Sequence, residues 1–163
     1  MPQITKGGKY IFGWSKISKN GELTFPRMAV EEYKLKEEQY VYIVSGSKQT
    51  GEFCVMTETL LSHSTLKNIL KNNPSLAERY LGEGELIVYK GRKYGWLSLN
   101  EDTVHLSDNL MKILDIKTGD KLLAIRSSNI AFTMGKKGEL IDRANGYKGI
   151  IEEYWEEFAI GLK

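Results

Sequence analysis

The chain has 163 residues, 41% of them hydrophobic, and a formal net charge of +2, which is typical of one compact domain or two very small ones. It contains no run of 18 apolar residues and no basic-then-apolar leader, so we expect neither a membrane span nor secretion. Cys54 is the only cysteine and can form no internal disulfide, which makes a reducing cytoplasm the expected location.

Residues 1–60 predict strands around one short helix. Asn20-Gly21 predicts a hairpin turn because both residue types tolerate positive φ. Residues 22–25 alternate polar and apolar side chains, as half-buried strands do, and Pro26 suits the first turn of a helix. Two apolar strands are expected after it at "YVYIV" and "FCVM", joined by the loop "SGSKQTG".

Residues 61–84 predict a helical connector. Leu66, Ile69 and Leu70 have helical spacing, and Pro74 begins a second helix after them. The connector therefore separates two strand-rich segments of similar length.

Residues 85–140 predict a second set of strands around a short helix. "ELIVYKGRKYGWLSL" indicates a hairpin around Lys90-Gly91-Arg92. "DTVHLS" alternates like the earlier strand, and Ser107 suits a helix cap because its hydroxyl accepts a backbone N–H. "LLAI" and "AFTM" predict the closing strands.

Residues 141–163 predict a C-terminal amphipathic helix. We expect its apolar face to pack on the rest of the chain or to form a homodimer, and its glutamates to be a solvated face rather than an acid/base or metal site. The apolar face comprises Ile150, Ile151, Tyr154, Trp155 and Phe158, and the opposite face Glu152, Glu153, Glu156 and Glu157.

The two strand-rich segments align with each other as a repeat. A constant offset of 81 residues, held from Lys19 to Ser47, places Leu23 over Val104 and Phe25 over Leu106. Upstream, Trp14 matches Trp96 after small length changes, and Lys9-Tyr10 matches Lys93-Tyr94. Downstream, "FCVM" matches "AFTM" if the first hairpin loop is the longer one. The agreement lies in pattern more than in identity and predicts an internal duplication.

These residues resemble the AbrB/SpoVT-type swapped-hairpin domain. "ISKNGELTFPRMAVEEYKLKEEQYVYIV" has the family's turn glycine, its alternating strand ending in proline, its short helix and its apolar strand. "LDIKTGDKLLAI" has the family's Gly-Asp turn at Gly119-Asp120. Each copy lacks one feature of the family's pattern that the other copy has. Glu38-Gln39 replaces the Gly-Asp turn in the first copy, and Ser107 replaces the proline in the second.

The resemblance implies a fold. Domains of this family act as dimers that interlace their hairpins into one small barrel, and two copies in one chain would supply both halves. We therefore expect an α+β fold, mainly β: an intrachain pseudo-dimer of two swapped-hairpin β-barrel-type repeats, with short helices and the C-terminal helix. Each copy would cover sheet edges that the other leaves open.

The resemblance also implies DNA binding through basic residues around the first hairpin. Lys16, Lys19 and Arg27 flank this turn, and Lys and Arg contacts to phosphate dominate DNA affinity. The second copy has Ser98, Asn100 and Asp108 in the matching places, with Glu101 and Asp102 in its turn, so a symmetric DNA-reading face is not expected. The alternative is that all of these are solvated turn residues.

Other residues offer little chemistry. His63 and His105 have no ligand spacing with Cys54, which argues against zinc. "GKKG" at 135–138 lacks the spacing and the Ser/Thr of a phosphate loop. Trp14 and Trp96 each follow a glycine, and their symmetry favours core packing over a ligand site. We expect no enzyme activity, no metal and no cofactor.

Two functional hypotheses follow. The first is an AbrB-like transcriptional regulator that binds double-stranded DNA through Lys16, Lys19 and Arg27. The alternative is a non-enzymatic protein-interaction or ligand-sensing module that keeps the fold without binding DNA. Salt-dependent DNA binding distinguishes the two.

Overall fold

A computed structural model describes residues 5–6, 9–45, 51–136 and 153–154. It is an α+β fold, mainly β, with several short helices. Among the described residues, no helix has the length and apolar character needed to cross a membrane. The strands are β1 (Thr5–Lys6), β2 (Lys9–Lys16), β3 (Glu22–Thr24), β4 (Tyr40–Ser45), β5 (Glu52–Met56), β6 (Ile87–Tyr89), β7 (Arg92–Ser98), β8 (Thr103–His105), β9 (Lys121–Arg126), β10 (Ala131–Gly135) and β11 (Glu153–Tyr154).

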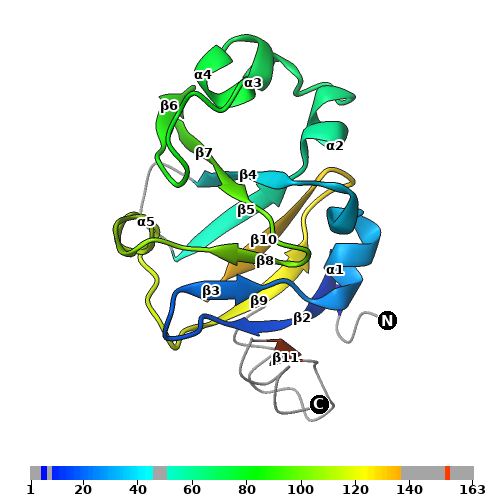
Figure 1. Ribbon diagram of the computed structural model, residues 1–163. Helices are drawn as coiled ribbons and strands as arrows, with labels where there is room; N and C mark the ends of the chain where they lie inside the picture. The colour runs from blue at the N-terminus through cyan, green and yellow to red at the C-terminus, as the bar shows by residue number, and fades with distance from the viewer. Residues whose placement is uncertain (1–4, 7–8, 46–50, 137–152, 155–163) are drawn as a thin grey trace.

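The helices are short and lie between these strands. α1 and α5 follow β3 and β8, and α2, α3 and α4 form the connector between the two strand-rich segments (Figure 1). The connector begins slightly earlier than the predicted residue 61. The bounds are α1 (Arg27–Glu32), a 3₁₀ turn η1 (Leu35–Glu37), α2 (Glu58–Ser62), α3 (Asn68–Lys71), α4 (Pro74–Ala77) and α5 (Asp108–Leu114).

The main sheet has a strand order that reads alike from both ends. The order is β1-β2-β9-β10-β5-β4-β7-β6, with every neighbouring pair antiparallel. In the alignment of the two segments, β2 corresponds to β7, β4 to β9 and β5 to β10. Each long strand of one segment therefore pairs with a strand of the other, as an approximate twofold arrangement requires.

The pairing registers on the two sides of the sheet agree. Trp14 on β2 pairs with Leu123 on β9, and Trp96 on β7 pairs with Tyr42 on β4. Since Leu123 lies 81 residues after Tyr42, the two pairs are equivalent under the predicted offset. The match of Trp14 with Trp96 agrees with this register.

Two strand pairs lie on the approximate twofold axis. β3 and β8 form a separate ribbon in which Leu23 pairs with Val104, the residue 81 positions later. In the centre of the main sheet Cys54 on β5 pairs with Thr133 on β10, and Cys54 Sγ lies 3.3 Å from Thr133 Oγ1. Cys54 is half-buried, so it is only partly the buried small hydrophobe that an apolar run suggests.

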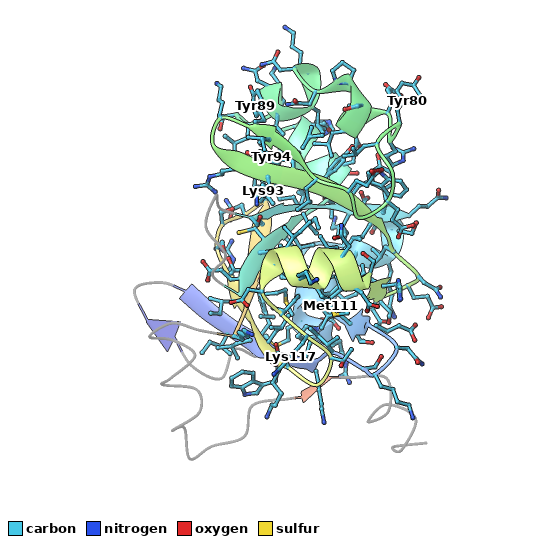
Figure 2. All side chains as sticks on the ribbon, turned by 90° about the vertical axis from the view of Figure 1, so that its left-hand side faces the viewer. Tyr80, Tyr89, Lys93, Tyr94, Met111 and Lys117 are labelled. Carbon is cyan, nitrogen blue, oxygen red and sulfur yellow. The ribbon has the colours of Figure 1, made fainter. Side chains whose placement is uncertain are left out.

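The helices α1 and α5 end at equivalent places. Lys34 follows α1 with φ 54°, and Asp115, 81 residues later, follows α5 with φ 60°. Their starts differ as predicted: Ser107 Oγ accepts a hydrogen bond from the Leu110 N–H at 3.1 Å, whereas Pro26 opens α1 without a side-chain cap. Figure 2 shows α5, with Met111 labelled, between the β6–β7 hairpin and the turn that carries Lys117.

The registers correct the predicted alignment outside the constant stretch. Phe53 is equivalent to Phe132 rather than to Ala131, because Cys54 and Thr133 pair on the axis and the offset falls to 79. The drop of two residues confirms that the first hairpin loop is the longer one. Upstream, Ile11 rather than Tyr10 occupies the place of Tyr94, because β2 has an irregularity between Ile11 and Gly13.

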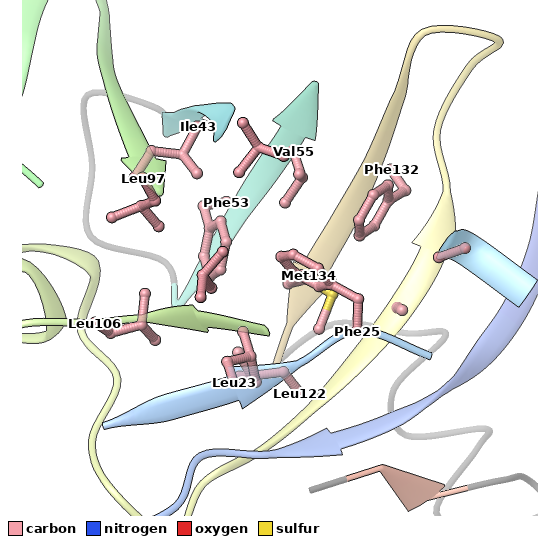
Figure 3. Close-up of a cluster of buried hydrophobic side chains, with 14 of the residues drawn as sticks. Leu23, Phe25, Ile43, Phe53, Val55, Leu97, Leu106, Leu122, Phe132 and Met134 are labelled. Carbon is pink, nitrogen blue, oxygen red and sulfur yellow. The ribbon is translucent and has the colours of Figure 1, made fainter. Parts of the chain in front are cut away.

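The main core lies between the large sheet and the β3–β8 ribbon. Figure 3 shows side chains from both segments meeting there, among them Leu23 beside Leu122. The rings of Phe25 and Phe132 pack edge-on with their centres 5.3 Å apart. Tyr33, the residue directly after α1, reaches the same core, and its hydroxyl donates to the Ser128 and Ala131 carbonyls at 2.8 and 2.9 Å. Burial raises the pKa of this phenol, so Tyr33 stays a hydrogen-bond donor at neutral pH.

The connector helices cover the opposite face of β4, β5 and β7. Leu61, Ile69 and Leu76, one from each connector helix, are buried against Tyr42 and Tyr94. These five side chains belong to a second hydrophobic cluster, separated from the main core by the sheet. Alternating residues of one strand, such as Tyr42 and Ile43, thus belong to different clusters.

The predicted C-terminal helix at 141–163 lies outside the described residues except for Glu153 and Tyr154. These two form strand β11, which pairs in parallel with β2 at Trp14 and Ser15. At this point the chain is therefore extended rather than helical.

A fragment ending at Gly82 tests the dependence of one segment on the other. It lacks β7, β8, β9 and β10, so β2, β3, β4 and β5 each lose an antiparallel partner. We expect residues 1–82 to be unfolded, aggregated or homodimeric, because unpaired backbone groups on exposed strand edges form hydrogen bonds with other chains. Circular dichroism and sedimentation experiments distinguish these states. A monomeric fragment with a cooperative melting transition would contradict the interlocked arrangement.

Candidate nucleic-acid interface

The three predicted DNA-binding residues lie at two places in the structure. Lys16 is the last residue of β2, and exposed Lys19 lies in the turn that leads to β3. Arg27, also exposed, begins α1 at the other end of β3 (Figure 1). Arg27 lies six positions after Gly21 along a nearly extended chain, which corresponds to about 20 Å.

The turn that carries Lys19 is fixed by its own side chains and by β8. Ser18 Oγ accepts hydrogen bonds from the Asn20 and Glu22 N–H groups at 3.2 and 3.1 Å. Gly21 has φ 81°, and a Cβ at this position would lie 2.5 Å from the Leu106 carbonyl oxygen. Only glycine fits here, because the φ is left-handed and the neighbouring strand is in contact.

The Gly-Asp turn of the second segment docks beside this first turn. The Ile17 N–H donates to the Asp120 carbonyl at 2.9 Å, and the Gly119 N–H donates to the Ile17 carbonyl at 2.8 Å. Asp120 Oδ2 accepts from the Lys117 N–H at 2.9 Å and from Lys136 Nζ at 3.1 Å. Asp120 therefore holds its own turn in shape and ties it to the end of β10.

Four lysines gather where these two turns meet, and we call this surface the basic end. Lys16 pairs across the sheet with Lys121 in the β2–β9 register. Lys19 and Lys117 are exposed on the adjacent turns. Lys121 Nζ lies 5.0 Å from the centre of the Trp14 ring, which is an attractive cation–π distance. The basic end thus comprises Lys16, Lys19, Lys117 and Lys121, two from each segment.

The equivalent place on the other side of the axis has a different composition, and we call it the second end. Ser98 replaces Lys16, and Tyr40 replaces Lys121 in the corresponding strand pair. The Tyr40 ring packs edge-on against Trp96 at 6.4 Å, so an aromatic pair occupies the position of the Lys121–Trp14 pair. Lys36 alone keeps the charge of its counterpart Lys117, and Glu101 lies in the turn that corresponds to the turn of Lys19.

Arg27 belongs to the second end because the two segments interlock. The Phe25 N–H donates to the Asp102 carbonyl at 2.8 Å, which places the start of α1 beside the turn of the second segment. The mirror contact, from the Leu106 N–H to the Gly21 carbonyl at 2.8 Å, places Asp108 beside the turn of the first segment. Residues close in sequence therefore face different ends.

Sequence reasoning missed Lys117 and Lys121. Their signal was present, because both flank the Gly-Asp turn that carried the family resemblance. Only the contact between that turn and Ile17 shows that they lie beside Lys16 and Lys19.

The remaining candidates stay apart from this surface. His63 lies after α2, and His105 is exposed on β8. Within the described ranges, no three His, Cys, Asp or Glu side chains converge as a metal site would require. Of the "GKKG" stretch, Gly135 and Lys136 are described, and the rest lies outside the described residues. An open pocket of about 260 Å³ is lined by Glu83, Gly84, Leu97, His105 and Ser107.

No family model and no curated protein matches the chain. The AbrB/SpoVT resemblance is therefore carried by the quoted residues alone and stays a prediction.

Replacing Asp120 tests the turn that presents Lys117. Asp120→Ala removes the acceptor of the Lys117 N–H and the ion-pair partner of Lys136, and we expect a loss of about 1–2 kcal/mol in the free energy of unfolding. Asp120→Asn keeps an acceptor for the N–H and should lose less. Urea unfolding of the two variants measures the difference, and equal stability of Asp120→Ala and wild type would show that this carboxylate does not hold the turn.

Proposed function

We propose that the protein is an AbrB-like DNA-binding regulator that contacts duplex DNA through the basic end. Lys16 and Lys19 come from the sequence prediction, and Lys117 and Lys121 join them. The observation that carries the proposal is the convergence of four lysines from two segments on one pair of interlocked turns. Arg27 is not part of this contact surface, because it lies at the second end.

The form of the basic end favours phosphate contacts over base stacking. Lys19 and Lys117 are exposed and make no ion pair within the described part of the chain. Trp14 is only 6% exposed, so its ring is no platform for a base. A compact group of lysines without an exposed aromatic ring suits the backbone of a duplex better than a single strand.

The finer fold assignment belongs to the same proposal. We take the two segments as degenerate swapped-hairpin repeats that together build one barrel-type pseudo-dimer, supported by the equivalent registers on both sides of the axis. Fusion into one chain frees the two ends to differ. At four equivalent positions the basic end has Lys16, Lys19, Lys117 and Lys121, and the second end has Ser98, Asn100, Lys36 and Tyr40. DNA binding by a single chain is then one-sided.

Removing exposed lysines from the basic end tests the function. We expect Lys19→Ala/Lys117→Ala to weaken binding of a fluorescein-labelled duplex and to reduce the slope of log K against log salt by about 1.8, since each phosphate contact contributes about 0.9. Fluorescence anisotropy at several salt concentrations measures both quantities.

The matched control is Arg27→Ala/Lys36→Ala, which removes the same charge from the second end. It should bind DNA like the wild type. An equal loss of DNA affinity in both double variants would show that binding depends on the net charge of the chain rather than on the basic end. Absence of binding by the wild type at low salt would favour the protein-interaction or ligand-sensing module instead.

A homodimer through residues 141–163 would present two basic ends to one duplex. Trp155 and Phe158, which follow β11 in the sequence, would each contribute roughly 1.5–3 kcal/mol when buried. We expect Trp155→Glu to dissociate such a dimer in sedimentation analysis. A lower melting temperature without a change of mass would instead place the segment against its own chain, and no change in either would contradict both roles.

A further inference from the structure

The β6–β7 hairpin and α3 carry a second concentration of positive charge. Residues 63–77 contain Lys67 and Lys71 and no carboxylate, and residues 86–100 contain Lys90, Arg92 and Lys93 and no carboxylate. We call these five cations the hairpin patch.

Contacts of Tyr89 join residues 63–77 to residues 86–100. Asn72, directly after α3, donates its Nδ2–H to the Tyr89 hydroxyl at 2.9 Å. The Tyr89 ring packs against Tyr94 at 6.1 Å, and Lys90 Nζ lies 5.5 Å from its centre. Tyr89 pairs with Arg92 across the hairpin. One ring therefore positions the hairpin tip against α3.

The hairpin patch is open to a partner. Lys67, Lys71, Lys90 and Arg92 are exposed, and in the part of the chain that the structure describes none of the five cations forms an ion pair. A Cβ added at Gly91, in the tip itself, would meet no atom within 4 Å. Unneutralised like charges repel one another, so a cluster of this kind gains from a polyanion.

The hairpin patch lies on the same side of the molecule as the basic end. Figure 2 shows Tyr89, Lys93 and Tyr94 above α5 and Lys117 below it, all toward the viewer. In Figure 1 the β6–β7 hairpin and the turn before β9 both lie along the left side. A rod-like ligand laid along this side would pass both surfaces.

We propose that the β6–β7 hairpin is a second phosphate-binding element, which grips the same DNA duplex as the basic end. This proposal rests on the function proposed above and extends it to residues of the connector and the second segment. Lys90 and Arg92 at the tip contact one stretch of backbone, and Lys71 on α3 supports them. The hairpin thereby supplies contacts that the one-sided basic end lacks.

The test is a triple variant, Lys90→Asn/Arg92→Gln/Lys93→Gln. Asn is chosen for Lys90 because its φ of 49° is left-handed and Asn tolerates this region. With a labelled duplex we expect a loss of affinity of about tenfold or more and a salt slope reduced by about 2.7 if all three contacts are lost. Thermal unfolding checks that the variant is folded. A second variant, Lys67→Gln/Lys71→Gln, changes the two lysines at the ends of α3 and leaves the hairpin intact.

The control is Arg27→Gln/Lys34→Asn/Lys36→Gln, which makes the same three changes on α1 and on the 3₁₀ turn η1 that follows it. Lys34 has a left-handed φ of 54°, so the Lys→Asn change is matched in conformation as well as in charge. This control should keep wild-type affinity and slope. A comparable loss in the control would overturn the proposal, because net charge alone would then explain the effect.

The outcomes separate this proposal from the function on which it rests. If Lys19→Ala/Lys117→Ala loses binding while both hairpin-patch variants bind like wild type, the regulator function stands and the second element is refuted. If only the hairpin-patch variants lose binding, the hairpin is the DNA site and the basic end is not. Binding of wild type to phosphatidylserine vesicles without binding to the duplex would overturn the proposal in favour of a membrane surface.

Discussion

The fold depends on strand pairing between two segments that are far apart in the chain. Within a segment, the described strands pair only through the hairpins β1–β2, β4–β5, β6–β7 and β9–β10. Apart from the parallel β2–β11 pair, the remaining ladders, β2–β9, β4–β7, β5–β10 and β3–β8, all join one segment to the other. Because buried backbone groups need hydrogen-bond partners, neither segment satisfies its own strands alone.

This interlocking decides where charged residues meet. The β3–β8 ribbon crosses the axis, so the helix that follows each strand starts beside the turn of the other segment. Arg27 is carried to the second end and Asp108 to the basic end, while the turn of Lys117 is brought to the turn of Lys19. The result is two equivalent ends that differ in which charged residues they carry, and the proposed DNA-binding role uses this difference.

The sequence predicted the local elements because local rules control them. Asn20-Gly21, Pro26, Ser107 and the Lys90–Arg92 hairpin each act through the φ preference or the hydrogen bonds of a few neighbouring residues. The constant offset was visible because buried positions of equivalent strands keep the same spacing.

What the sequence did not predict depends on contacts between distant residues. The alignment slipped by one residue at "FCVM", because loop length changes freely while strand pairing fixes the equivalence of Phe53 with Phe132. The grouping of Lys16, Lys19 and Arg27 assumed that neighbours in sequence share a surface. The pairing of strands between the two segments breaks this assumption. The hairpin patch went unnoticed because its two parts lie on different elements and meet only through Tyr89 and Asn72.

The most direct test of this account is a disulfide on the twofold axis. Cys54 is the only cysteine and faces Thr133 across β5 and β10, with Sγ and Oγ1 3.3 Å apart. We expect Thr133→Cys to form an intrachain disulfide on mild oxidation, seen as a monomer in a non-reducing gel whose intact mass has lost the two thiol hydrogens. Free thiols after oxidation, or cross-linked dimers alone, would contradict the pairing of the two segments within one chain.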